Sequence, residues 1–446
     1  MLTVRSTRMV LPDGVRPAAV LVRDGRIARV GAYDETAPAI PVIDAGDLAV
    51  LPGLVDTHVH VNEPGRTEWE GFDTATRAAA AGGVTTIVDM PLNSVPPTTT
   101  VGGLDAKLAA AGDAAHVDVA FWGGVVPGNT AELPPLVGRG VAGFKCFLAP
   151  SGVDEFGHVA EADLRAALPA LARAGVPLLV HAEDPAALRD PPPGADPRDH
   201  AVWLDTRPDA AEVRAVEMLV RLAREFGVRI HVVHLATAEA LPLLRAARGA
   251  GVPITAETCP HYLTFAAEEI PPGATPFKCA PPIRSRTHRE ALWQALIAGE
   301  VDLVASDHSP APPDMKRVSD GDFLAAWGGI ASLQLALPAA WTGAAARGVS
   351  LHHVARWMGA APARLAGLQG KGSIAVGGDA DFVFFDPEAD FVVDPRRLEH
   401  RHPVTPYDGM RLRGVVRRTL LRGEIIYDDG RLMASRRGRL LLHGGR

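Results

Sequence analysis

The sequence contains little lysine and almost no cysteine. Five of its 446 residues are lysine, and the formal net charge is −7. Because a protein that neutralises nucleic-acid phosphates needs clusters of basic residues, this balance argues against a nucleic-acid partner. The cysteines number three, and each stands in a motif-like segment, so the sequence does not indicate a disulfide framework. They are Cys146, Cys259 and Cys279.

Long apolar runs and targeting signals are also absent from the sequence. No stretch approaches the roughly 18 uncharged apolar residues of a membrane span. Residues 1–8 lack the apolar core of a signal peptide. We therefore expect a soluble, cytoplasmic protein with no membrane partner. The hydrophobic fraction of 47% is enough for a large core and an appended domain.

Segments that resemble β-strands stand at both ends of the chain. Near the N-terminus, Asp24-Gly25 predicts a hairpin turn within residues 19–30, and Arg422-Gly423 predicts a turn near the C-terminus. Neither end alone has enough strands to be stable, so we expect the two ends to pair into one small β-sandwich. The expected domains are 1–50 and 369–446 for the two parts of the sandwich, and 51–368 for the region between them.

The central region alternates predicted strands with helices rich in alanine, leucine and arginine. Eight such units predict an α/β fold, a (β/α)8 TIM barrel, in which catalytic groups lie at the C-terminal ends of the strands. The expected strands are residues 54–58, 84–89, 117–122, 141–148, 176–181, 230–234, 252–257 and 301–306.

Histidine and aspartate side chains stand at the ends of several of these strands. His58 and His60 share one strand face, because side chains alternate with period two. A single strand-end histidine is more often only hydrogen-bonded, and Asp307 alone could cap a helix. Their joint placement predicts a metal centre. The candidate ligands are His58, His60, His181, His234 and Asp307. We expect His261 to support the ligands from outside or to be structural, and His308 to point away from the metals.

Lys145 lies inside the apolar run 141–148. A bare ammonium is costly to bury, so either its pKa falls or its charge is removed chemically. A neutral amine that captures carbon dioxide becomes a carbamate, which is an anionic oxygen donor able to bridge two cations. Lys145 is therefore predicted to be carboxylated and to act as a further metal ligand.

Seven segments together resemble the cyclic-amide branch of the amidohydrolases, and within it the allantoinases. The resemblance implies that His58, His60 and Asp307 hold one metal and that His181 and His234 hold the other. Lys145, as N6-carboxylysine, would bridge both metals, and Asp307 would also transfer the proton in catalysis. The segments are 56–72, 89–98, 143–147, 257–263, 278–284, 306–316 and 326–331.

The same resemblance implies cofactors and partners. It implies two divalent metal ions per subunit, with zinc favoured and manganese, cobalt or iron as alternatives. It also implies a homotetramer that opens allantoin to allantoate in purine breakdown. Asn62, Asn93 and Ser309 are the expected substrate contacts, although a local hydrogen bond or a helix cap explains each of them equally well.

Related activities differ in the residues expected around the substrate. Dihydroorotases carry an arginine where this chain has Asn62, and that cation pairs with a substrate carboxylate. Hydantoinases and dihydropyrimidinases tend to have a tyrosine and an asparagine where this chain has Pro150 and Gly328. Dihydroorotase, hydantoinase and dihydropyrimidinase are therefore the alternative functions. A non-catalytic assembly protein is a remote alternative, because such relatives lose metal ligands that this chain keeps.

Overall fold

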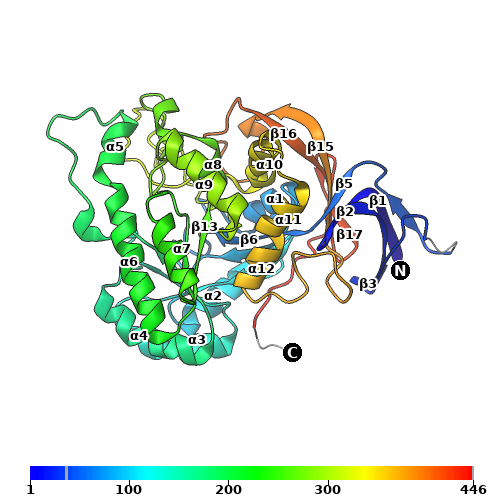
Figure 1. Ribbon diagram of the computed structural model, residues 1–446, viewed down its shortest axis with the longest axis horizontal. Helices are drawn as coiled ribbons and strands as arrows, with labels where there is room; N and C mark the ends of the chain where they lie inside the picture. The colour runs from blue at the N-terminus through cyan, green and yellow to red at the C-terminus, as the bar shows by residue number, and fades with distance from the viewer. Residues whose placement is uncertain (36–38, 444–446) are drawn as a thin grey trace.

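The computed structural model describes residues 1–35 and 39–443, and it consists of a barrel with a sheet at its side (Figure 1). Both ends of the chain contribute to that sheet, which has nine strands in the order β18-β17-β16-β15-β5-β1-β2-β3, with β4 paired to β1. The strands are β1 (Leu2–Leu11), β2 (Gly14–Arg23), β3 (Arg26–Gly31), β4 (Val42–Asp44), β5 (Ala49–Pro52), β15 (Phe382–Val392), β16 (Arg411–Leu421), β17 (Glu424–Asp428) and β18 (Arg431–Leu432).

Tight turns connect the hairpins of this sheet as the sequence predicts. Asp24 and Gly25 have φ angles of 52° and 74° between β2 and β3, and Arg422 and Gly423 have 51° and 78° between β16 and β17. Two successive positive φ angles match the right-handed twist of the flanking strands. The two chain ends meet where β5 pairs antiparallel with β15.

The central region forms the predicted TIM barrel. Its parallel strands are β6 (Leu54–Val59), β7 (Val84–Asp89), β8 (Asp118–Phe121), β9 (Gly123–Gly124), β10 (Phe144–Phe147), β11 (Leu178–His181), β12 (Ile230–Val232), β13 (Ile254–Thr258) and β14 (Leu303–Val304). Because β8 pairs with β7 and β9 pairs with β10, these two short pieces together occupy one strand position. A parallel bridge between Val59 and His308 closes the ring.

Helices surround the barrel and bury one face against its strands. In the longest helix, Ala215, Leu219 and Leu222 are buried at helical spacing. The helices are α1 (Phe72–Ala81), α2 (Val101–Ala111), α3 (Leu133–Arg139), α4 (Glu161–Ala174), α5 (His200–Thr206), α6 (Asp209–Phe226), α7 (Leu241–Gly249), α8 (Pro260–Thr264), α9 (Arg286–Ala298), α10 (Ala336–Ala346), α11 (Leu351–Ala355) and α12 (Ala361–Leu365). Within residues 1–35 and 39–443, no helix is long and apolar enough to cross a membrane.

The sheet and the barrel are joined by backbone and side-chain contacts. Leu440, beyond the last strand of the sheet, forms a parallel bridge with Val119 of β8. Lys371 forms ion pairs with Asp118 of β8 and with Asp381 next to β15, at 2.6 Å and 2.8 Å. The domain limits at 50 and 368 remain a prediction.

Candidate metal centre

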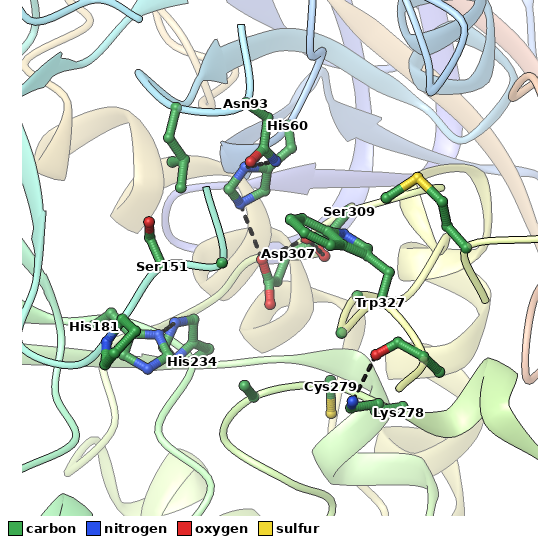
Figure 2. Close-up of a pocket in the computed structure, with 18 of the residues that line it drawn as sticks. His60, Asn93, Ser151, His181, His234, Lys278, Cys279, Asp307, Ser309 and Trp327 are labelled. Atoms are coloured by element: carbon green, nitrogen blue, oxygen red, sulfur yellow. Dashed lines mark hydrogen bonds and ion pairs between the residues drawn. The ribbon is translucent and has the colours of Figure 1, made fainter. Parts of the chain in front are cut away.

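A pocket of about 480 Å³ opens at the C-terminal ends of the barrel strands. Figure 2 shows His60, His181, His234 and Asp307 around this pocket, and His58 lines it as well. His58 and His181 belong to β6 and β11, whereas His60, His234 and Asp307 belong to the segments that follow β6, β12 and β14. The barrel therefore gathers the five candidate ligands that stand at strand ends, although they span 250 positions from Asp307 back to His58.

His58, His60 and Asp307 form the first group of candidate ligands. Oδ1 of Asp307 lies 3.1 Å from Nε2 of His58 and 3.5 Å from Nε2 of His60. One ligand atom from each residue lies within 4.8 Å of the others, and all three side chains are buried. Two imidazole nitrogens and a carboxylate oxygen at these separations fit a single divalent cation.

His181 and His234 form the second group. Nδ1 of His181 lies 3.0 Å from Nε2 of His234. Two nitrogens bound to one zinc ion at tetrahedral angles would lie roughly 3.3 Å apart. The two rings therefore already stand at the separation that a shared cation requires.

Burial sets the protonation of these groups. It lowers the pKa of His60 to about 4, even though Asp307 opposes the shift, and it lowers the pKa of His234 well below the usual value. Burial would raise the pKa of Asp307, but His58 and the other imidazoles hold it well below its ordinary range. Near neutral pH the group therefore contains unprotonated imidazoles and an ionised carboxylate, which are the forms that bind metals.

Lys145 is fully buried in β10, and its amine lacks a hydrogen-bond partner in the described part of the chain. Burial lowers the pKa of this amine to about 8, although Asp307 and Glu257 oppose the shift. Nζ lies 4.9 Å from the centre of the Phe147 ring, which stacks on His181. An unsatisfied amine whose charged form is disfavoured by burial, beside two groups of candidate metal ligands, suits a carbamate, because that group would supply the missing polar contacts.

Carboxylates behind the histidines are part of the site, although they are not among the site residues predicted from the sequence. Oε1 of Glu257 lies 2.5 Å from Nδ1 of His58, and its Oε2 lies 3.0 Å from Nε2 of His231. Glu183 contacts Nε2 of His181 at 2.6 Å and pairs with Arg207. Such carboxylates fix the tautomer and orientation of a metal-binding imidazole. The His-x-Glu spacing of 181–183 was a usable signal for Glu183.

Five residues at the site have positive φ angles, although none is glycine. They are Asn62 at 66°, Asn93 at 66°, His234 at 41°, Asp307 at 47° and Arg317 at 52°. Most residues avoid this left-handed region, and such strained positions concentrate at functional sites. The barrel therefore imposes costly backbone conformations where the candidate ligands and two candidate substrate contacts stand.

The three predicted substrate contacts have different surroundings. Asn93 and Ser309 line the pocket, and Oγ of Ser309 donates to Oδ1 of Asp307 at 3.0 Å. Asn62 is buried, does not line the pocket, and has no hydrogen-bond partner for its amide in the described residues. Pro150 and Gly328 both line the pocket, so the two positions that distinguish hydantoinases do face the site. Substrate contact by these residues remains a prediction.

The other two histidines near the site lie outside the two ligand groups. His308 contacts Glu70 at 3.3 Å and accepts a hydrogen bond from the backbone N–H of Ser332 at 3.1 Å. His261 is buried without a hydrogen-bond partner in the described residues, and its ligand atom lies within 4.8 Å of those of Cys259 and Asp307. His308 is therefore held by structural contacts, whereas His261 lies close to Asp307 without a hydrogen bond to it.

Comparisons with known proteins agree with this geometry. Residues 49–426 match the model of the amidohydrolase family. The chain is 53% identical to an allantoinase from Streptomyces avermitilis, over 99% of this chain and 98% of that protein. It is 43% identical to an allantoinase from Arabidopsis thaliana, over 98% of this chain and 90% of that protein.

Solved structures show the same fold. An L-hydantoinase (dihydropyrimidinase) from Arthrobacter aurescens superposes with a TM-score of 0.94 at 31% identity, covering 99% of each chain. Family match, sequence relatives and barrel geometry agree, and the chain belongs to the amidohydrolase family.

Proposed function

We propose that this chain is an allantoinase, a metal-dependent cyclic amidohydrolase that opens the hydantoin ring of (S)-allantoin to give allantoate. The observation that carries the proposal is the pocket at the barrel mouth, where His58, His60, His181, His234 and Asp307 converge. Relatives from bacteria, plants and yeast that are named allantoinases support the choice of substrate, with identities of 43–53% to this chain.

The proposed metal-binding residues form two groups of ligands, one for each cation, and one residue that contacts both cations. His58, His60 and Asp307 would hold one divalent cation, and His181 and His234 would hold the other. Lys145, carboxylated by carbon dioxide, would contribute an oxygen to each. When bound, the two cations would supply a water of lowered pKa and would polarise the scissile carbonyl. Zinc is the favoured metal, with manganese, cobalt and iron as alternatives, because imidazole and carboxylate sites accept all four.

Asp307 is the proposed proton carrier. Its low pKa keeps it ionised, so it can accept the proton of the attacking water and deliver it to the departing ring nitrogen. That delivery matters because an amide anion is a very poor leaving group. Ser309 donates a hydrogen bond to Oδ1 of Asp307, which restricts the rotation of the carboxylate.

The pocket favours a neutral ring over a carboxylate-bearing one. Of the lysine and arginine residues that line it, Arg207 is paired with Glu183, Arg317 is paired with Asp320, and Lys278 donates to backbone carbonyl groups. The position at which dihydroorotases carry arginine holds Asn62, which is neutral. Hydantoinase activity is the nearest alternative, because the structural neighbours bear that name. Pro150 and Gly328 line the pocket without the tyrosine and asparagine expected of that activity.

Three finer assignments belong to the proposal. We expect zinc in the cell, a homotetramer, and a cytoplasmic location. Metal analysis of the purified protein, light scattering and cell fractionation would check them in turn.

A substrate panel tests the proposed activity. The purified protein, stripped of metal and then reloaded with zinc, manganese or cobalt, is assayed with allantoin, dihydroorotate and a 5-substituted hydantoin. We expect allantoin to be opened fastest and only with metal present. A preference for the hydantoin or for dihydroorotate would contradict the assignment. Absence of turnover with every metal and substrate would favour the assembly-protein alternative.

A further inference from the structure

All five lysines of the chain are buried. Lys107 pairs with Asp89, Lys371 pairs with aspartates, and Lys145 is the candidate carbamate. Lys278 and Lys316 differ, because neither forms an ion pair within the described residues and both donate their hydrogen bonds to backbone carbonyl groups. Figure 2 shows Lys278 at the edge of the pocket with one of these bonds.

The hydrogen bonds of these two ammonium groups converge on one segment. Nζ of Lys316 donates to the carbonyl oxygens of Lys278 at 3.1 Å, Trp327 at 3.0 Å and Gly329 at 2.7 Å. Nζ of Lys278 donates to the carbonyl oxygens of Leu324 at 3.0 Å and Ala326 at 2.5 Å. It also lies 4.2 Å from the centre of the Trp203 ring. These contacts occupy the donor capacity of both groups, which leaves little for a substrate.

The segment 311–329 needs such anchors. It contains neither helix nor strand, yet eight of its residues line the pocket. Many of its backbone hydrogen bonds close local turns, such as those of Lys316 with Pro312 and of Gly321 with Arg317, so contacts from buried side chains add to what holds the segment in place. The pocket-lining residues are Asp314, Met315, Arg317, Ala325, Ala326, Trp327, Gly328 and Gly329.

Both lysines are held at an electrostatic cost. Burial lowers the pKa of Lys278 to about 8 and that of Lys316 to about 7, because no carboxylate in contact compensates the charge. An ammonium buried in this way is unfavourable unless its hydrogen bonds are all satisfied. Here the oriented carbonyl groups of 324–329 satisfy them, so the segment and the lysines stabilise each other.

We propose that Lys278 and Lys316 are positioning residues that hold segment 311–329 as a wall of the active-site pocket. Trp327 is the side chain most directly placed by this arrangement, because the carbonyl groups of Ala326 and Trp327 are both bound by the lysines. Its indole also packs edge-on against Trp69, with ring centres 4.9 Å apart. Loss of either ammonium group should make segment 311–329 more mobile, while all the proposed metal ligands stay in place. The expected change in KM rests on the proposed allantoinase activity, whereas the expected position of segment 311–329 does not depend on it.

Two variants, Lys278→Met and Lys316→Met, test the proposal, because methionine keeps most of the side-chain volume and removes every donor. We expect tryptic cleavage after Arg317, mapped by mass spectrometry, to become about tenfold faster, since local opening controls proteolysis. KM for allantoin should rise about five- to tenfold with kcat changed less than about threefold, because the wall contributes to binding and not to proton transfer. Metal content should stay at the wild-type value. Arg16→Met, which removes an exposed charge on β2, is the matched control and should change none of these quantities.

Hydrogen exchange on the wild-type protein provides a second test, which does not depend on whether a variant folds. The amides of Trp327 and Gly329, bonded to Met315 and Lys278 at 2.7 Å and 2.9 Å, should exchange about tenfold or more slowly than those of the exposed segment 189–196. Equally fast exchange in the two segments would overturn the proposal, as would wild-type cleavage and KM in both variants. If the wild type does not open allantoin, the proposed function fails, while cleavage and exchange still decide the role of the lysines.

Discussion

Burial affects Lys145 and Asp307 in opposite ways at the scale of single residues. It lowers the pKa of the Lys145 amine to about 8, because the charged form loses hydration. The same burial would neutralise Asp307, yet the neighbouring imidazoles keep its pKa well below the ordinary range. Burial therefore favours the neutral form of the Lys145 amine, while the imidazoles keep the Asp307 carboxylate ionised.

The first residue-scale prediction concerns Asp307→Asn. The amide oxygen can still coordinate a cation, but it cannot take a proton from water. We expect kcat to fall by about 10²–10⁴-fold while metal content, measured by plasma emission spectroscopy, falls much less. Near-full turnover in this variant would remove Asp307 from the mechanism.

The second residue-scale prediction concerns Lys145→Ala. Without a bridging oxygen, two cations would repel each other, so we expect loss of activity and of at least one metal per subunit. Acetate or propionate could occupy the vacated volume and restore part of the activity when metal is present. Two metals and normal turnover in the variant would refute the carbamate, because an ordinary buried lysine affects only stability.

Side chains from different barrel strands cooperate at the scale of secondary-structure elements. Glu257, at the end of β13, contacts His58 of β6 with one oxygen and His231 of β12 with the other. His231 in turn contacts Oγ1 of Thr255 at 2.7 Å through Nδ1. The orientation of a candidate ligand on the first barrel strand is thus set by side chains from two other strands.

The element-scale prediction concerns Glu257→Gln, which keeps the volume of the side chain. Glutamine cannot accept from both histidines through two carboxylate oxygens, so His58 should lose its fixed orientation. Metal affinity, measured by competition with a chromophoric chelator, should fall about 10–100-fold. Glu225→Gln, on the exposed face of α6, is the matched control and should bind metal as the wild type does. Unchanged affinity in Glu257→Gln would show that His58 is oriented by other contacts.

Lys371 joins the sheet to the barrel at the scale of the whole molecule. It forms ion pairs with Asp118, Asp379 and Asp381 at 2.6–2.9 Å, and Arg422 also pairs with Asp118. Asp118 belongs to barrel strand β8, whereas Asp381 precedes β15 of the sheet. One buried cation therefore neutralises carboxylates from both parts of the molecule.

The whole-molecule prediction concerns Lys371→Met. Removing one partner of a buried ion pair typically costs about 3–5 kcal/mol, so the midpoint of thermal unfolding should fall by several degrees. Burial already raises the pKa of Asp381, although Lys371 opposes the shift, and loss of the ammonium should raise it further. A carboxyl group whose pKa is higher in the folded state than in the unfolded state stabilises the fold fully below the unfolded-state pKa and loses this effect as pH rises through the folded-state pKa. The variant's loss in the midpoint of thermal unfolding, relative to the wild type, should therefore be smaller at pH 5.5 than at pH 8. An equal or larger loss at pH 5.5 would contradict this account.

Local sequence patterns determined the barrel, the hairpins and the candidate ligands of this protein. Strand periodicity placed His58 and His60 on one face, and Asp24-Gly25 specified its turn, because both signals depend only on neighbouring residues. Tertiary structure alone decided which distant groups meet. Glu257 lies 199 positions from His58, Gly123 and Gly124 form a separate short strand, and Lys278 meets a segment that begins 33 positions later. Such pairings follow from closure of the barrel, which no local periodicity encodes.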